Sequence, residues 1–158
     1  RVVEWIKLLE PDVTLVDAVG VGSSVYDTLR DIGYEPIAVN NGLKALDERK
    51  FFNRRAEVWW KMKEWLAGGG RIPDDDRELM DDLTAPEYGY SDRGERVQIE
   101  SKDDMRSRGL PSPDTADCLS QTFFLPVAPS RRRAAITSKL MKVMRAMRQP
   151  SGTTWMSN

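Results

Sequence analysis

The chain contains no histidine and one cysteine, Cys118, among its 158 residues. The first absence excludes a serine–histidine–aspartate triad, a cysteine–histidine dyad and any histidine-ligated metal site within this chain. A single cysteine excludes an intrachain disulfide and a cysteine-rich zinc site. The sequence also lacks the phosphate-binding pattern G-x-x-x-x-G-K-[ST], so we expect no ATP hydrolysis. It has no run of about 18 apolar residues, so we expect no membrane-spanning helix.

Charge is divided unevenly along the chain, although the net charge is only −1. Residues 1–125 carry 17 lysines and arginines against 25 acidic residues, whereas residues 126–158 carry seven basic residues and no acid. The length is about that of one domain, which is enough for a hydrophobic core. The sequence therefore predicts an acidic folded body followed by a basic tail.

A strand–helix–strand unit is expected in the amino-terminal third. Residues 2–9 place apolar side chains at helical spacing, and Pro11 ends that helix. Residues 13–17 and 34–39 are typical of buried strands, and a helix over about residues 22–33 separates them. Because such a unit gives a parallel strand pair with a right-handed crossover, we expect an α/β fold.

Helices and a hairpin are expected in the rest of the chain. They are a helix capped by Asn53 and ending near Leu66, a short helix ending at Leu83, a hairpin within residues 87–99, a short helix over residues 102–108, a helix from Ser112 to about residue 125 with Pro113 in its first turn, and a basic amphipathic helix over residues 136–147.

Three aspartates are the main candidates for chemistry. Asp17 ends a predicted strand before a glycine-containing loop, where α/β sheets place their sites, and carboxylates are good ligands for Mg²⁺ or Mn²⁺. Alternatively, Asp17 only caps the next helix or bonds its turn. Asp114 and Asp117 are three apart on one predicted helix and repel one another unless a cation lies between them. Asp114 could equally be an ordinary acid of a first helical turn.

Other side chains are weaker candidates. Lys102 could bind a phosphate or pair with a catalytic carboxylate, and Glu100 belongs to the same charged segment. Trp59 and Trp60, with Trp65, could stack on nucleic-acid bases, but their helical spacing favours the core. Glu57, on the same predicted helix, is expected at the surface or in the cap region of that helix.

Several blocks of sequence, in order along the chain, resemble the nuclease domain of phage large terminase subunits. The blocks are VDAVGVG at residues 16–22, LRDIG at 29–33, FNRRAEVW at 52–59, ESKDDMRSRG at 100–109 and SPDTADCL at 112–119. Cys118 stands where the family usually has alanine. The resemblance covers residues 1 to about 128, leaving residues 129–158 as a separate basic amphipathic helix and tail.

The resemblance implies an RNase H-like mixed sheet flanked by helices, and a metal-dependent endonuclease. Asp17 and Asp117 fall on family metal ligands, with Asp114 close by, and two Mg²⁺ or Mn²⁺ ions are implied. The implied role is cutting concatemeric double-stranded DNA during genome packaging in the host cytoplasm, together with the terminase small subunit and the portal protein. The family's first metal-binding aspartate and its ATPase domain would precede Arg1, so we expect an incomplete domain that is weakly active or inactive and marginally stable.

Two other functions remain open from the sequence. The chain could be a non-catalytic module that docks on DNA or the portal through its basic tail, or a truncated prophage remnant. In the first case the binding residues would lie in the tail, and they are Arg131, Arg132, Arg133, Lys139 and Lys142.

Overall fold

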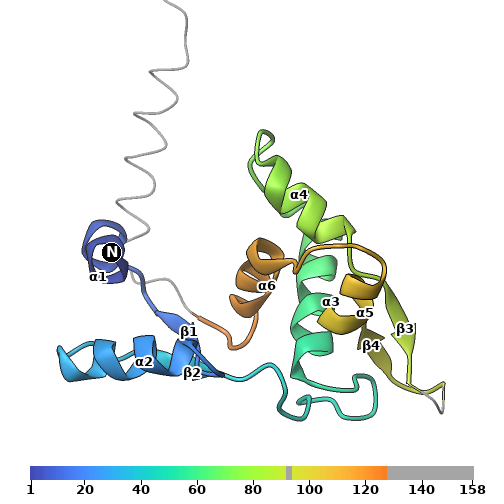
Figure 1. The fold of residues 1–158 in the computed structure, drawn as a ribbon, viewed down its shortest axis with the longest axis horizontal. Coiled ribbons are helices and arrows are strands. Elements are labelled where there is room, and N and C mark those ends of the chain that lie inside the picture. Colours follow the sequence, from blue (N-terminus) through green and yellow to red (C-terminus); the bar gives the residue numbers. More distant parts are fainter. Residues whose placement is uncertain (92–93, 128–158) are drawn as a thin grey trace, which may run out of the picture. The chain divides into compact units, whose positions relative to one another are not determined.

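The computed structural model describes residues 1–91 and 94–127, and residues 1–126 form one compact unit (Figure 1). The elements of this unit are α1 (Val2–Leu9), β1 (Leu15–Asp17), α2 (Gly22–Asp31), β2 (Ile37–Val39), α3 (Arg54–Ala67), α4 (Arg77–Thr84), β3 (Tyr88–Tyr90), β4 (Val97–Ile99), α5 (Lys102–Ser107) and α6 (Asp114–Gln121). The order matches the order predicted from the sequence. The predicted tail helix and the candidates Arg131, Arg132, Arg133, Lys139 and Lys142 lie outside the described residues.

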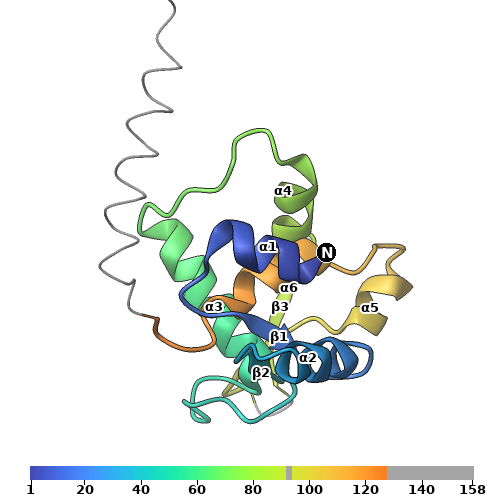
Figure 2. The ribbon, with the colours of Figure 1, turned by 90° about the vertical axis from the view of Figure 1, so that its left-hand side faces the viewer.

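The strand–helix–strand unit forms as expected, with shorter strands. β1 pairs in parallel with β2, with Asp17 opposite Val39, and α2 packs on β1 (Figure 2). The turn between β1 and α2 depends on glycine. A methyl group at Gly22 would lie 1.7 Å from the carbonyl oxygen of Asp17, and Gly20 has a positive φ of 66°. This turn places the side chain of Asp17 at the carboxyl end of β1.

The main core forms around α3, which begins at Asn53. The Asn53 side chain accepts the backbone N–H of Ala56 at 2.9 Å, as the predicted cap requires. α3 packs against α6 and β4, and α4 also packs against α6. The buried residues of this core are Val58, Trp59, Met62, Leu79 and Ala116. Trp59 therefore belongs to the core as expected, whereas Trp65 is 38% exposed.

The last helix is shorter than the sequence suggested. α6 begins after Pro113, which is the N-cap residue with a non-helical ψ of 62° and makes no side-chain capping bond, so Pro113 does not lie in the first turn as predicted. Instead, Asp82 of α4 accepts the backbone N–H of Thr115 at 2.9 Å and caps the helix from a distance. Beyond Gln121 the backbone forms tighter bonds to the residue three positions earlier, which ends the helix before residue 125.

The described residues contain two separate two-stranded sheets, β1–β2 and β3–β4. The second is the predicted antiparallel hairpin, with Tyr88 opposite Ile99. An α/β class is therefore confirmed for the described part of the chain. Each helix in residues 1–91 and 94–127 is too short or too polar to cross a lipid bilayer.

Candidate functional site

Asp117 lies at the centre of a polar cluster between α3, α5 and α6, to which Arg55, Trp59 and Lys102 contribute. Its side chain is 10% exposed. Trp59 Nε1 donates to Asp117 Oδ1 at 2.8 Å, and Arg55 Nε donates to the same oxygen at 3.2 Å. Trp59 and Arg55 are four residues apart on α3, so they share the face that meets α6. Asp117 is therefore a buried carboxylate whose Oδ1 is held by two donors of one helix.

The other oxygen of Asp117 faces Lys102. The ammonium of Lys102 lies 3.1 Å from Asp117 Oδ2 and 3.1 Å from Asp114 Oδ1. Partial burial lowers the pKa of Lys102, but the hydrogen bonds to Asp117 and Asp114 outweigh it and raise the pKa above its usual value. Lys102 therefore stays charged and joins the two carboxylates that the sequence placed on one face of a helix.

Asp114 differs from Asp117 in its surroundings, although both carboxylates contact Lys102. The Asp114 side chain is 77% exposed, and Ser112 Oγ lies 2.7 Å from its Oδ1. The hydrogen bond from Ser112, followed by that from Lys102, holds the pKa of Asp114 below its usual value. Asp114 is thus the surface partner of the pair.

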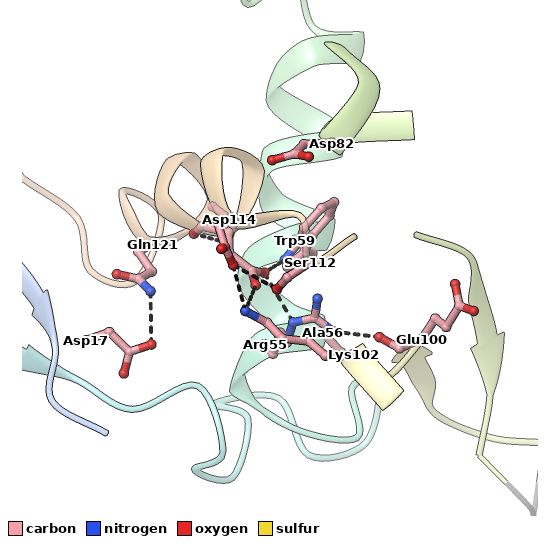
Figure 3. Close-up of polar contacts among 12 residues, drawn as sticks. Asp17, Arg55, Ala56, Trp59, Asp82, Glu100, Lys102, Ser112, Asp114 and Gln121 are labelled. Atoms are coloured by element: carbon pink, nitrogen blue, oxygen red, sulfur yellow. Dashed lines mark hydrogen bonds and ion pairs between the residues drawn. The ribbon is translucent and has the colours of Figure 1, made fainter. Parts of the chain in front are cut away.

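Asp17 lies near the carboxyl end of α6, whereas Asp114 lies at the amino end of that helix. The Oδ1 of Asp17 accepts the backbone N–H of Val19 at 3.1 Å, which is the turn contact foreseen as the alternative to a site role. Its Oδ2 lies 3.5 Å from Nε2 of Gln121, the last residue of α6 (Figure 3). Gln121 is four residues beyond Asp117 and shares its helix face. The exposed carboxylate of Asp17 therefore lies at one end of the face that carries Asp117.

The carboxylate of Glu100 takes no part in this cluster. It accepts hydrogen bonds from Arg108 Nη1 at 2.5 Å and from the backbone N–H of Glu87 at 3.1 Å. The hydrogen bond from Arg108 is the main reason that the pKa of Glu100 lies below its usual value. Only the backbone of Glu100 reaches the cluster, because its carbonyl oxygen accepts Arg55 Nη1 at 2.6 Å (Figure 3).

Arg55 was not predicted as a functional residue, and Trp59 was considered only for base stacking, not as a partner of Asp117. They lie 62 and 58 positions before Asp117, so no local pattern connects them to it. The signal that could have found them is their four-residue spacing, which places both side chains on one face of α3. Arg55 Nη2 is buried without a hydrogen-bond partner among the described residues.

Glu57 was expected at the surface or near the cap of its helix; it lies in the first turn of α3, next to the cap, but it is buried. Its side chain is 4% exposed. It accepts Arg54 Nη1 at 2.7 Å, Lys61 Nζ at 2.8 Å and the backbone N–H of Leu46 at 2.7 Å. Burial raises the pKa of Glu57, but these hydrogen bonds outweigh it and leave the pKa below its usual value. Two cations and one N–H group thus stabilise an acid inside the fold.

The carboxylates suit a hard divalent cation in chemistry but are few in number. Among the described residues, no three acids, histidines or cysteines lie close enough together to hold a metal ion. Mg²⁺ commonly uses only one or two carboxylates and completes its shell with waters and substrate phosphates. Asp117, whose Oδ2 now contacts Lys102 at 3.1 Å, and the exposed Asp17 are carboxylates of the type that such a site uses.

Comparison with solved structures finds the nuclease domain of the large terminase subunit gp2 of bacterial virus Sf6. A variant containing manganese and beta-thujaplicinol is 17% identical, with a TM-score of 0.61 over 78% of this chain and 70% of that chain. A variant containing calcium is 19% identical, with a TM-score of 0.61 over 78% of this chain and 69% of that chain. No protein-family model and no curated protein matches the sequence.

The structural likeness agrees with the sequence resemblance, which rested on separate blocks between residues 16 and 119. The TM-score is the same for each of these structures, with or without a named metal ion. At 17–19% identity, such a likeness establishes the fold. Over most of its length, this chain therefore has the fold of the nuclease domain of a phage large terminase subunit.

Proposed function

We propose that this chain is the metal-dependent, DNA-cutting part of a phage large terminase subunit. The observation that carries the proposal is the environment of Asp117. Its buried carboxylate accepts a hydrogen bond from Trp59 through Oδ1, and its Oδ2 faces Lys102. The fold supports the proposal, because the nuclease domain of the Sf6 large terminase subunit has this fold and is found with manganese or calcium.

The proposed ligands for Mg²⁺ or Mn²⁺ are Asp117 and Asp17, with Asp114 as an additional carboxylate. When bound, divalent ions polarise a phosphate group and generate a nucleophilic hydroxide from water, and two ions are the arrangement that we propose. This chemistry needs no histidine, which agrees with the composition of the chain.

The chain's own residues have distinct proposed roles around the phosphate. Trp59 and Arg55 occupy Asp117 Oδ1 and so keep Oδ2 directed towards the substrate side. Lys102 holds a proton and a positive charge 3.1 Å from each of two carboxylates. It is placed to donate a charge-assisted hydrogen bond to a phosphate oxygen of DNA.

The biological setting is part of the same proposal. The substrate would be concatemeric double-stranded DNA in the cytoplasm of the bacterial host, and the partners would be the terminase small subunit and the portal protein. The RNase H-like topology is the corresponding proposal for the fold.

The test has two parts. Calorimetry measures the binding of Mn²⁺, and a second assay measures the cutting of supercoiled plasmid DNA in the presence of Mn²⁺ or Mg²⁺. We expect Mn²⁺ binding and slow, ion-dependent conversion of the plasmid to nicked and linear forms, abolished by a chelator. Failure to bind Mn²⁺ and failure to cut, in a protein that is folded by circular dichroism, would exclude the nuclease and leave a docking module.

Replacing Trp59 by phenylalanine tests the anchoring of Asp117. The change keeps an aromatic ring in the core but removes the N–H that donates to Asp117 Oδ1 at 2.8 Å. Loss of such an orienting hydrogen bond typically lowers metal affinity or activity about 10- to 100-fold, and we expect this loss in Mn²⁺ affinity.

Trp60→Phe is the matched control for this experiment. It removes the same indole N–H from the next residue of α3, where the acceptor is Glu64 at the surface. We expect its Mn²⁺ affinity to equal that of the unmodified chain. Equal affinities in the Trp59 and Trp60 variants would show that Trp59 does not orient a ligand.

A further inference from the structure

A pocket lies between α3, the end of α4 with the segment that follows it, and the β3–β4 hairpin. Its volume is about 270 Å³, which approaches the size of a small-ligand site. Figure 1 shows the β3–β4 hairpin on one side of α3, with β4 nearer to the helix, and α4 above. The lining is aromatic and aliphatic apart from one lysine, and consists of Trp59, Trp60, Met62, Lys63, Leu66, Leu83, Pro86, Tyr88 and Ile99.

The walls of the pocket present apolar surface, and their two indole N–H groups are not available to a ligand. The indole N–H of Trp59 is taken by Asp117, and that of Trp60 is taken by Glu64 at 2.8 Å. Both indole donors are therefore satisfied outside the pocket. A molecule bound here would find apolar surface and rings for stacking, so the part of it that enters must be apolar.

Lys63 is the one charged residue of the lining. Its ammonium lies 4.3 Å from the ring centroid of Trp60 and 4.5 Å from that of Tyr88. Within the described part of the chain it forms these ring contacts and no ion pair. The neighbouring Lys61 and Lys50, in contrast, pair with Glu57 and Glu64. Lys63 therefore places a cation without an acidic partner beside an apolar pocket.

We propose that this pocket binds a flat, apolar molecule that carries one negative charge, such as an aromatic carboxylate or sulfonate. The ring system enters between Trp60, Tyr88 and the aliphatic lining, and the anion binds the ammonium of Lys63. Rings already hold the lysine, so little of its conformational freedom is lost on binding. The proposal is independent of the nuclease activity proposed above.

The size of the pocket limits the affinity. A ligand of about a dozen non-hydrogen atoms that fills it is expected to bind with a dissociation constant on the order of 0.1 mM. Trp59 gives the site a reporter, because its ring lines the pocket while its N–H donates to Asp117. Binding is therefore expected to change the environment of an indole N–H that also belongs to the candidate site.

The test is a titration of the whole chain with 2-naphthoate, followed by nuclear magnetic resonance of the tryptophan indole N–H groups. Trp59 and Trp60 line the pocket and are expected to shift, whereas Trp5 of α1 does not line it and serves as the internal control. The neutral 2-naphthamide has the same rings without the charge. We expect it to shift the same signals with about tenfold weaker affinity, because the amide lacks the negative charge that strengthens the contact with the ammonium of Lys63.

Lys63→Met separates the charge from the apolar lining. The side chain is exposed and the substitution keeps most of its length, so the fold is retained. We expect the affinity for 2-naphthoate to fall about tenfold, to the value for 2-naphthamide, which should not change. Lys44→Met, at an exposed lysine that pairs with Glu48, is the control and should change neither affinity.

Two results would overturn the proposal. One is an equal shift of the Trp5 signal, which would mean that naphthoate binds the apolar surface without selection. The other is an undiminished preference of the Lys63→Met variant for the anion, which would place the charge recognition elsewhere. Both results leave Mn²⁺ binding and plasmid cutting untouched, so they are distinct from failure of the proposed nuclease function.

Discussion

Asp117→Asn is expected to abolish Mn²⁺ binding and, at the same time, to lower the free energy of unfolding by about 3 kcal/mol. The stability loss arises because Arg55, whose side chain is 13% exposed, would keep its buried charge without the carboxylate that it now contacts at 3.2 Å. Trp59 can still donate to the amide oxygen of asparagine. The measurements are calorimetry with Mn²⁺ and unfolding in urea without metal.

Asp114→Asn is the matched control, because it removes an acid of the same helix that also contacts Lys102. The Asp114 side chain is 77% exposed, so the free energy of unfolding should change by no more than about 0.5 kcal/mol. An Asp117→Asn chain that unfolds like the control, or that still binds Mn²⁺ normally, would contradict the central place given to Asp117.

The expected loss of stability in Asp117→Asn is opposite to the change that the sequence alone suggests. Two acids three residues apart on a helix should repel, so removing either one should stabilise the metal-free chain or leave it unchanged. In the structure, Lys102 lies between Asp114 and Asp117, and Arg55 binds the buried oxygen. The carboxylates are therefore neutralised by cations of the chain itself, and charge repulsion is not the dominant contribution.

The order of helices and strands was predictable because local signals determine it. Asn53 accepts an N–H of the first turn of α3, and the spacing of apolar residues marks the buried face of that helix. The glycine-containing turn after Asp17 identified the strand–helix–strand unit. These signals lie within a few residues of the structure that they specify, so the sequence displays them directly.

The contacts of the candidate site could not be predicted, because they join residues far apart in the chain. Arg55 reaches Asp117 across 62 positions, and Asp17 reaches Gln121 across 104. Such pairs depend on how α3, α6 and β1 pack, which a periodic pattern does not contain. The sequence could name Asp17 and Asp117 from their chemistry and their positions at element ends, but not the donors around them.

The partners of Glu57 could not be read from the sequence either, and its substitution is expected to have the second large effect, on the free energy of unfolding. Glu57→Gln should lower the free energy of unfolding by about 4 kcal/mol, because breaking a buried ion pair leaves an uncompensated charge. The charge is that of Arg54, whose side chain is 7% exposed and whose other end-group nitrogen donates to the carbonyl oxygen of Phe124. Glutamine can still accept the N–H of Leu46, so the substitution removes the charge and keeps that acceptor.

The dependence of stability on pH provides a second measurement of the same residue. The pKa of Glu57 is lower in the folded chain than its ordinary value of 4.5, so the folded state favours the ionised form. This contribution is present above pH 4.5 and is lost as the pH falls through the folded pKa. Unfolding in urea from pH 7 downwards should therefore show a loss of stability below pH 4.5 that is smaller in Glu57→Gln.

Glu48→Gln is the matched control, because Glu48 is an acid of the same type whose side chain is 55% exposed and pairs with Lys44 at 3.3 Å. An exposed ion pair of this kind contributes about 0–1 kcal/mol to stability. Glu48→Gln should therefore lower the free energy of unfolding by no more than that amount at every pH. Equal losses in both variants would mean that the buried charge of Arg54 finds another partner when Glu57 is neutral. The substitution Glu57→Gln should lower the free energy of unfolding more than Glu48→Gln does, and only at pH values at which Glu57 of the unmodified chain is ionised. This result would show that the ion pair of Glu57 and Arg54 is a main stabilising contact of α3.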